Sequence, residues 1–111
     1  MADEGSRPRV EILYVEGCPN YDRTHALVER VAAELRIEPE VELIEVRDDH
    51  SALELRFPGS PTVRVNGRDV EPGGSEHQDF VLSCRVYPRE GGFAGQPDEA
   101  WIRAALEEPQ G

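Results

Sequence analysis

The chain has 111 residues and a formal net charge of -11 at pH 7, from 23 acidic and 12 basic residues. This size predicts a single domain with one core. The acidic surface excludes nucleic acid and anionic membranes as partners, because both carry negative charge. Every basic residue is an arginine, so Schiff-base chemistry and lysine-containing phosphate loops are excluded too.

Residues 1–8 are predicted to be a flexible tail, and residues 9–108 a single domain. The start of the chain is polar, without the apolar run of a secretory signal, and no later stretch is long enough to span a membrane. We therefore expect a cytoplasmic protein, in which cysteines stay reduced unless they take part in chemistry. The two cysteines, Cys18 and Cys84, are too few for a disulfide scaffold and lack zinc-finger spacing. No cofactor is predicted.

An apolar strand over residues 10–15 runs directly into an amphipathic helix, which is predicted to start at Pro19 and to end near Arg36. Pro19 suits the first helical position because a proline lacks the N–H that would be unpaired there. Cys18 is then predicted to be the N-cap, where free amides and the helix dipole favour thiolate over thiol. The alternative is that Cys18 is a small buried apolar residue.

A second strand is predicted over residues 41–46, which makes a right-handed β-α-β unit with parallel strands. Asp48 or Asp49 is predicted to cap a short helix that ends before Pro58-Gly59. Asn66-Gly67 follows a strand and is the preferred dipeptide of a two-residue type I′ hairpin turn. A crossover followed by a hairpin gives a mixed sheet.

Residues 72–96 are rich in glycine and proline and predict a long, partly ordered insertion. A last helix is predicted to start at Pro97, with Trp101 and Ile102 on its buried side. The predicted fold class is α/β, with a central mixed β-sheet in the order β-α-β-α-β-β-α, flanked by helices.

A cysteine at the first strand–helix corner and the segment Gly59-Ser60-Pro61-Thr62 before the hairpin accompany this order of elements. Together they resemble the thioredoxin fold, over residues 10–71 and 97–107. The resemblance implies a thioredoxin-like fold in which Pro61 has a cis peptide bond and lies against Cys18.

The same resemblance implies a substrate-binding site made of Pro19, Tyr21, Ser60 and Pro61. The backbone of Ser60 is expected to be free to pair with an extended thiol substrate. Tyr21 stands where a thioredoxin has the second cysteine of Cys-x-x-Cys, so the local resolving thiol is missing. Ile12 stands where thioredoxins usually carry a buried acid for proton transfer. These two departures leave one activated thiol at the corner.

Cys84 in the insertion is a candidate second thiol. Because the hairpin ends beside the Pro61 loop, residues after it can fold back over the Cys18 corner. A disulfide would require the two Cα atoms to come within about 7 Å. A reduced pair is instead suited to holding a soft metal ion between two thiolates.

The segments Glu16-Gly17-Cys18-Pro19, Gly59-Ser60-Pro61-Thr62 and Ser83-Cys84-Arg85-Val86-Tyr87 carry a second, looser resemblance. They are similar to segments of short bacterial proteins grouped with the alkylmercury lyases. This resemblance implies that two cysteines take the mercury while an acid protonates the leaving carbon. Asp22 and Asp69 are the candidate acids.

Three functions follow as hypotheses. The first is thiol–disulfide exchange on a thiol or disulfide substrate, with Cys18 as nucleophile and Cys84 as possible resolving thiol. The second is cleavage of an organomercurial, or binding of a mercury ion, by the same two residues. The third is a non-catalytic interaction module. His25, on the first helix, is expected to be a partly exposed helix residue rather than a base for Cys18.

Overall fold

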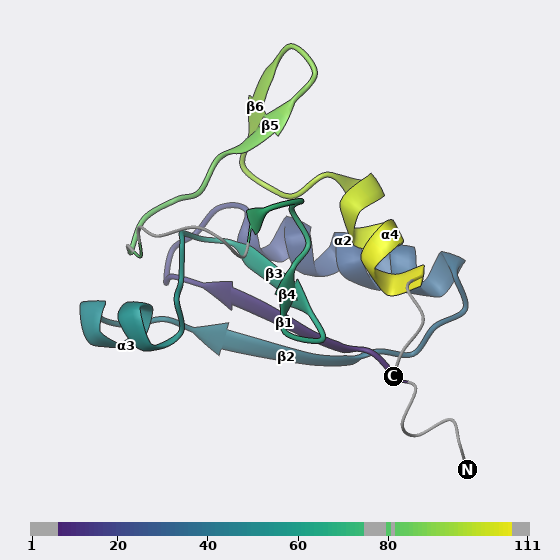
Figure 1. The fold of residues 1–111 in the computed structure, drawn as a ribbon, viewed down its shortest axis with the longest axis horizontal. Coiled ribbons are helices and arrows are strands. Elements are labelled where there is room, and N and C mark those ends of the chain that lie inside the picture. Colours follow the sequence, from purple (N-terminus) through teal and green to yellow (C-terminus); the bar gives the residue numbers. More distant parts are fainter. Residues whose placement is uncertain (1–6, 75–79, 81, 108–111) are drawn as a thin grey trace.

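The computed structural model describes residues 7–74, 80 and 82–107. They form a mixed α/β structure with a four-stranded central sheet and a separate two-stranded hairpin (Figure 1). The elements in chain order are β1 (Arg9–Tyr14), α2 (Tyr21–Glu34), β2 (Glu40–Glu45), α3 (Asp49–Glu54), β3 (Thr62–Val65), β4 (Arg68–Asp69), β5 (Tyr87–Arg89), β6 (Gly92–Ala94) and α4 (Glu99–Glu107).

The central sheet has the strand order β2-β1-β3-β4. β1 pairs in parallel with β2 and antiparallel with β3, and β3 pairs antiparallel with β4. The predicted parallel unit, hairpin and mixed sheet are therefore confirmed. Asn66 and Gly67 form the turn between β3 and β4 with φ values of 53° and 87°, and a type I′ turn requires a positive φ at both positions.

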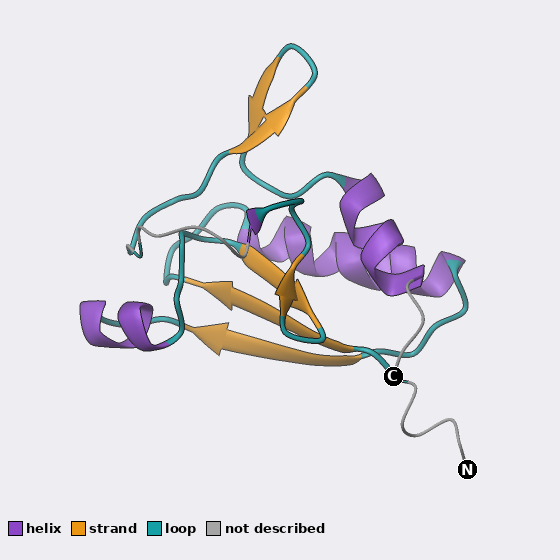
Figure 2. Ribbon diagram, viewed as in Figure 1, coloured by secondary structure: helices purple, strands orange, loops and turns teal. Residues whose placement is uncertain are grey.

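The helices α2 and α4 lie on one face of the sheet (Figure 2). Alternate residues of a strand point to opposite faces, so β1 and β3 each give one set of side chains to this core. The core residues are Val10, Ile12, Leu27, Val28, Val31, Ala32, Val63, Val65, Val70, Ile102 and Leu106. Leu13, on the opposite side of β1, packs with Val46, Ala52 and Phe57 in a smaller cluster beside α3. β1 is thus buried on the side of α2 and α4, and on its other side only at Leu13, since Arg9 there is exposed and Glu11 is half-buried.

Four charged side chains hold α4 against α2. Arg30 contacts Glu99 of α4 at 2.8 Å and Glu34 of its own helix at 3.1 Å. Arg103 contacts Glu99 at 2.8 Å and also pairs with Glu34. Hydrogen bonds from the two arginines lower the pKa of Glu99 to about 2, so the cluster stays ionised over the whole neutral range.

The end of α2 lies two residues before the predicted one. Arg36 takes a φ of 58°, and the Ile37 N–H donates to the Ala32 carbonyl at 2.9 Å. This bond closes the helix in a Schellman-type end. The following strand can then return beside β1.

The starts of the two shorter helices are set by aspartates. The Asp48 carboxylate accepts from the Ser51 N–H at 2.8 Å and caps α3 as predicted. The Asp98 carboxylate accepts from the Ala100 N–H at 2.9 Å. α4 therefore starts one residue after Asp98, and the prediction that Pro97 is its first residue is wrong.

Two segments contain more structure than predicted, the end of the N-terminal tail and the insertion 72–96. Pro8, at the end of the predicted tail, is buried, and its carbonyl accepts from the Glu40 N–H at 2.9 Å. Residues 1–6 of that tail lie outside the described residues. The insertion 72–96 contains the β5–β6 hairpin, which the sequence pattern does not indicate because each strand has three residues and they include Pro88 and Gly92.

Candidate functional site

The carboxyl end of β1 leads into a turn that carries Cys18. The Cys18 N–H donates to the Val15 carbonyl at 3.2 Å, and the Tyr21 N–H donates to the Cys18 carbonyl at 3.5 Å. These bonds hold Cys18, which is half-buried, at the edge where the parallel strands β1 and β2 end. In open α/β sheets, ligands bind outside this edge.

Cys18 is not the N-cap of α2, so this prediction is wrong. The N-cap is Asn20, whose side chain makes no capping hydrogen bond, and the first helical bond runs from the Thr24 N–H to the Asn20 carbonyl at 3.0 Å. The Cys18 carbonyl closes a turn instead of starting the helix, and Pro19 is exposed within that turn. Cys18 therefore does not occupy the capping position next to the first-turn amides of α2.

Pro61 lies next to the Cys18 turn through its neighbour Ser60. The Ser60–Pro61 peptide bond is cis, as the sequence resemblance implies. Ser60 is buried, and its Oγ accepts a hydrogen bond from the Val15 N–H at 3.1 Å. The Val15 carbonyl accepts from Cys18, so this one residue joins the Cys18 turn to the Pro61 loop.

Cys84 is paired with the same serine. The Ser60 N–H donates to the Ser83 carbonyl at 2.8 Å, and the Arg85 N–H donates to the Ser60 carbonyl at 2.9 Å. The result is an isolated parallel bridge between Ser60 and Cys84. The insertion therefore returns to the Pro61 loop, and the approach of Cys84 to Cys18 stays a prediction. The prediction that the Ser60 backbone is free for a substrate strand is wrong, because the chain itself occupies both groups.

The two cysteines therefore belong to one connected set of contacts. Both are free thiols; Cys18 is half-buried and Cys84 is exposed. Residues paired across a β-bridge point their side chains to the same face. The Cys84 side chain consequently lies on the side of the Ser60 hydroxyl, which is bound to Val15.

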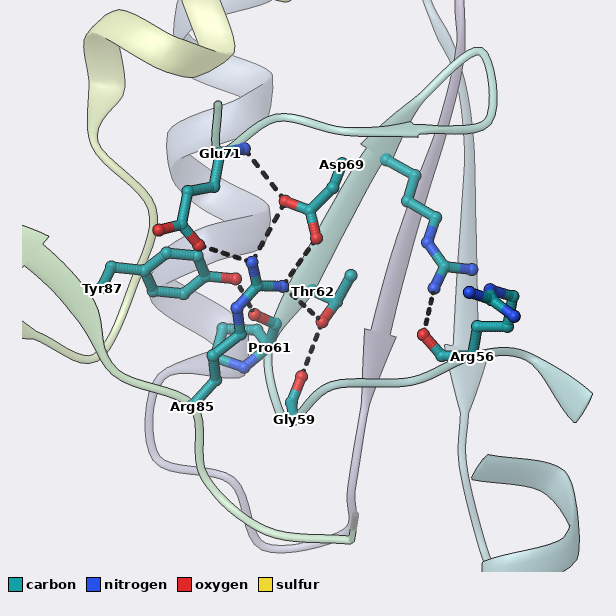
Figure 3. A network of polar contacts seen from close by, with 9 residues as sticks. Arg56, Gly59, Pro61, Thr62, Asp69, Glu71, Arg85 and Tyr87 are labelled. Carbon is teal, nitrogen blue, oxygen red and sulfur yellow. Dashed lines mark hydrogen bonds and ion pairs between the residues drawn. The ribbon is translucent and has the colours of Figure 1, made fainter. Parts of the chain in front are cut away.

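Arg85 anchors the segment that carries Cys84 (Figure 3). Its guanidinium donates to Thr62 Oγ1 at 3.0 Å and to the two carboxylate oxygens of Asp69 at 2.8 and 3.2 Å. A further bond reaches Glu71 at 2.7 Å. The Arg85 and Asp69 side chains are only 3% and 2% exposed. A buried charge is tolerated when it is paired and hydrogen-bonded in this way.

Tyr87 also anchors the Pro61 loop. Its hydroxyl donates to the Pro61 carbonyl, and the Arg85 guanidinium lies over its ring at 4.4 Å from the centroid. Burial raises the pKa of Tyr87, so the hydroxyl keeps its proton. The Thr62 hydroxyl donates to the Gly59 carbonyl at 2.6 Å. Figure 3 shows these side chains converging on the Pro61 loop.

The two candidate acids lie in different places. Asp69 has its carboxylate engaged by Arg85, as described above, and Asp22 is exposed in the first turn of α2. The described contacts therefore do not set either carboxyl group against a thiol.

Tyr21 packs in an aromatic stack beside the Cys18 turn. Its ring lies 3.9 Å from that of Tyr14, centroid to centroid, and 6.4 Å from that of His25. Burial and the neighbouring Tyr14 raise the pKa of Tyr21. His25 contacts Glu29 at 3.1 Å and is half-buried on the surface of α2, as expected for a helix residue.

An open pocket of about 460 Å³ lies at this end of the molecule. It is lined by Val15, Glu16, Glu45, Val46, Arg47 and Leu82. Glu16 comes two residues before Cys18, and Leu82 comes two residues before Cys84, so the pocket lies beside both segments. A larger pocket of about 890 Å³ lies at the other end of α2, around Pro8 and Ile37, and no cysteine lines it.

No family model matches this sequence, and no curated protein is significantly similar to it. Among the described residues, no three His, Cys, Asp or Glu side chains are grouped as they would be around a metal ion. The described helices are all too short or too polar to cross a bilayer.

Proposed function

We propose that the chain is a thioredoxin-like protein that performs thiol–disulfide exchange with Cys18 and Cys84 as its redox pair. The mixed sheet, the placement of α2 and α4, and the cis proline beside the Cys18 turn support the thioredoxin-like assignment. One observation carries the function, namely the bridge between Ser60 and Cys84. It brings a second thiol to the loop that is already joined to the Cys18 turn.

Exposure assigns the first step to Cys84, which reverses the roles that the sequence suggested. The Cys84 thiolate attacks one sulfur of a substrate disulfide, so that a mixed disulfide forms and the first substrate thiolate leaves. The Cys18 thiolate then attacks the Cys84 sulfur, forms the Cys18–Cys84 disulfide and releases the second substrate thiolate. The two protons of the protein thiols pass to the two products. The substrate gains two electrons, and the pair loses them.

Oxidation with glutathione disulfide tests this pair. We expect the wild-type protein to lose two hydrogens, without a lasting glutathione adduct, because the second thiol displaces the first adduct. Peptide mapping by mass spectrometry should locate the bond between Cys18 and Cys84. The matched variants Cys18→Ser and Cys84→Ser should each retain one glutathione. Stable adducts on both cysteines of the wild type would show that the two thiols do not meet.

The same two thiols are also the donor set for a soft metal ion, because thiolates favour such ions. Cys84 is bridged to Ser60, which Val15 joins to the Cys18 turn. Titration with mercuric chloride should then bind one ion per chain, with thiolate-to-mercury absorption that disappears in Cys18→Ser. Two ions per chain, one on each cysteine, would exclude a shared site. We do not extend the function to cleavage of an organomercurial, because Arg85 engages the Asp69 carboxylate and the described contacts do not set the exposed Asp22 against a thiol.

A further inference from the structure

Three exposed apolar side chains form a strip on the outer face of the β5–β6 hairpin. Val86 is 65% exposed and Phe93 is 74% exposed. Pro88, also exposed, is the residue paired with Phe93 across the two strands. We call Val86, Pro88 and Phe93 the apolar strip. Single exposed apolar residues are ordinary, but a contiguous group of them marks an interaction site.

The apolar strip leads directly to the exposed thiol. From Cys84 to Pro88 the chain alternates between exposed and buried residues, with Arg85 and Tyr87 buried. An extended chain turns every second side chain to the same side, so Cys84, Val86 and Pro88 lie in a row. Phe93 of the neighbouring strand extends that row.

The inner face of the hairpin is fixed to the domain. The Tyr87 ring lies 6.1 Å from that of Trp101, and the Arg89 guanidinium lies 5.7 Å from the same Trp101 ring. Arg89 also donates to the Gln96 carbonyl. The hairpin therefore projects from the body of the molecule as an anchored element (Figure 1), with its apolar side turned to solvent.

We infer that the apolar strip docks a polypeptide with an apolar segment flanked by basic residues, and that it presents that polypeptide's disulfide to Cys84. This inference rests on the proposed function and names its class of substrate. The net charge of -11 selects a basic partner and opposes pairing of two copies of this chain. Since the Ser60 backbone is occupied, the partner is positioned by the strip instead of by that backbone.

The test uses the Cys18→Ser variant, in which Cys84 is the only thiol and the mixed disulfide persists. The probes are three peptides of equal length whose single cysteine carries a pyridylthio group. One has leucine and phenylalanine flanked by arginines, one has the same apolar residues flanked by glutamates, and one has arginines with serines in place of the apolar residues. The small neutral disulfide 2,2′-dithiodipyridine serves as the reference, and release of pyridine-2-thione gives each rate.

We expect the basic apolar peptide to react about tenfold faster than the other two, relative to the reference, since binding it buries apolar surface and pairs opposite charges. Adding Val86→Ser and Phe93→Ser should remove this advantage and leave the rate with the reference unchanged. Leu53→Ser removes an apolar side chain that is 61% exposed on α3, and this control should keep the advantage.

Each other outcome is decisive. Reaction with the reference but equal rates for the three peptides would overturn the docking inference and leave the redox pair intact. No reaction even with the reference would overturn the redox pair and the inference together. A wild-type dimer in sedimentation that Phe93→Ser dissociates would assign the strip to a second copy of the chain, again overturning the inference.

Discussion

Replacing Arg85 with methionine should lower the free energy of unfolding by about 3–5 kcal/mol, because the change removes the buried guanidinium that contacts the Asp69 carboxylate and Glu71. A domain of this size has a total stability of about 5–15 kcal/mol, so the loss is a large fraction of it. Unfolding in urea, followed by circular dichroism, measures the change. We also expect slower formation of the Cys18–Cys84 disulfide, since the segment with Cys84 loses its anchor.

Two variants control the Arg85 experiment. Arg68→Met removes an exposed arginine on the neighbouring strand β4, and its effect should stay within about 0.5 kcal/mol. The double change Arg85→Met with Asp69→Asn should recover part of the lost stability, because the second substitution removes the buried negative charge that Arg85 contacts in the wild type. Equal losses for Arg85→Met and Arg68→Met would mean that the buried ion pair contributes little.

Replacing Gly59 with alanine should cost about 2–4 kcal/mol, from a strained backbone together with overpacking. Gly59 has a φ of +137°, and a Cβ built on it would lie 2.9 Å from the Arg85 Cβ and 3.3 Å from the Ser83 carbonyl oxygen. The new methyl group must push the Cys84 segment away from Ser60. Urea unfolding measures the cost, and the rate of alkylation of Cys84 by iodoacetamide reports the displacement.

Gly67→Ala is the matched control for Gly59. Gly67 also has a positive φ, of +87°, but a Cβ there would meet nothing within 4 Å. Its substitution therefore measures backbone strain alone, and it should leave the alkylation rate of Cys84 unchanged. If both alanine variants lose the same stability, and if Cys84 is alkylated at the wild-type rate in both, the close approach between Gly59 and Arg85 does not limit the residue at position 59.

The architecture of the sheet could be predicted because its signals are local. The apolar run before Cys18, the helical period after it and the Asn66-Gly67 turn each involve neighbouring residues. The aspartate cap of α3 is also a local signal, because Asp48 bonds to Ser51 three residues later. The exact start of α2 could not be predicted in this way, since Pro19 is as compatible with a turn as with a first helical position. The hydrogen bond from the Cys18 N–H to the Val15 carbonyl favours the turn. This bond cannot be predicted from the propensities of single residues.

The candidate site depends on contacts between residues that are far apart in the sequence. The pairing of Ser60 with Cys84 joins segments separated by 24 positions, and Arg85 reaches back to Asp69 and Glu71. The alternation of polar and apolar residues around Arg85 would place Val86 on the buried side of an extended segment, whereas the structure buries Arg85 and exposes Val86. The local pattern is therefore reversed here, and the buried ion pair could not be predicted from it.

The acidic residues of strand β2 oppose the pairing of this sheet edge with another chain. β2 lies at one end of the strand order, and in the described part of the chain only β1 pairs with it. A free strand edge can recruit another chain and begin a fibril. Glu40, Glu42 and Glu45 account for half of this strand. If two such edges met in antiparallel register, Glu40 of one copy would face Glu45 of the other, and like charges in opposed positions destabilise the pairing. The glutamates of β2 thus serve as a barrier to self-assembly along this border.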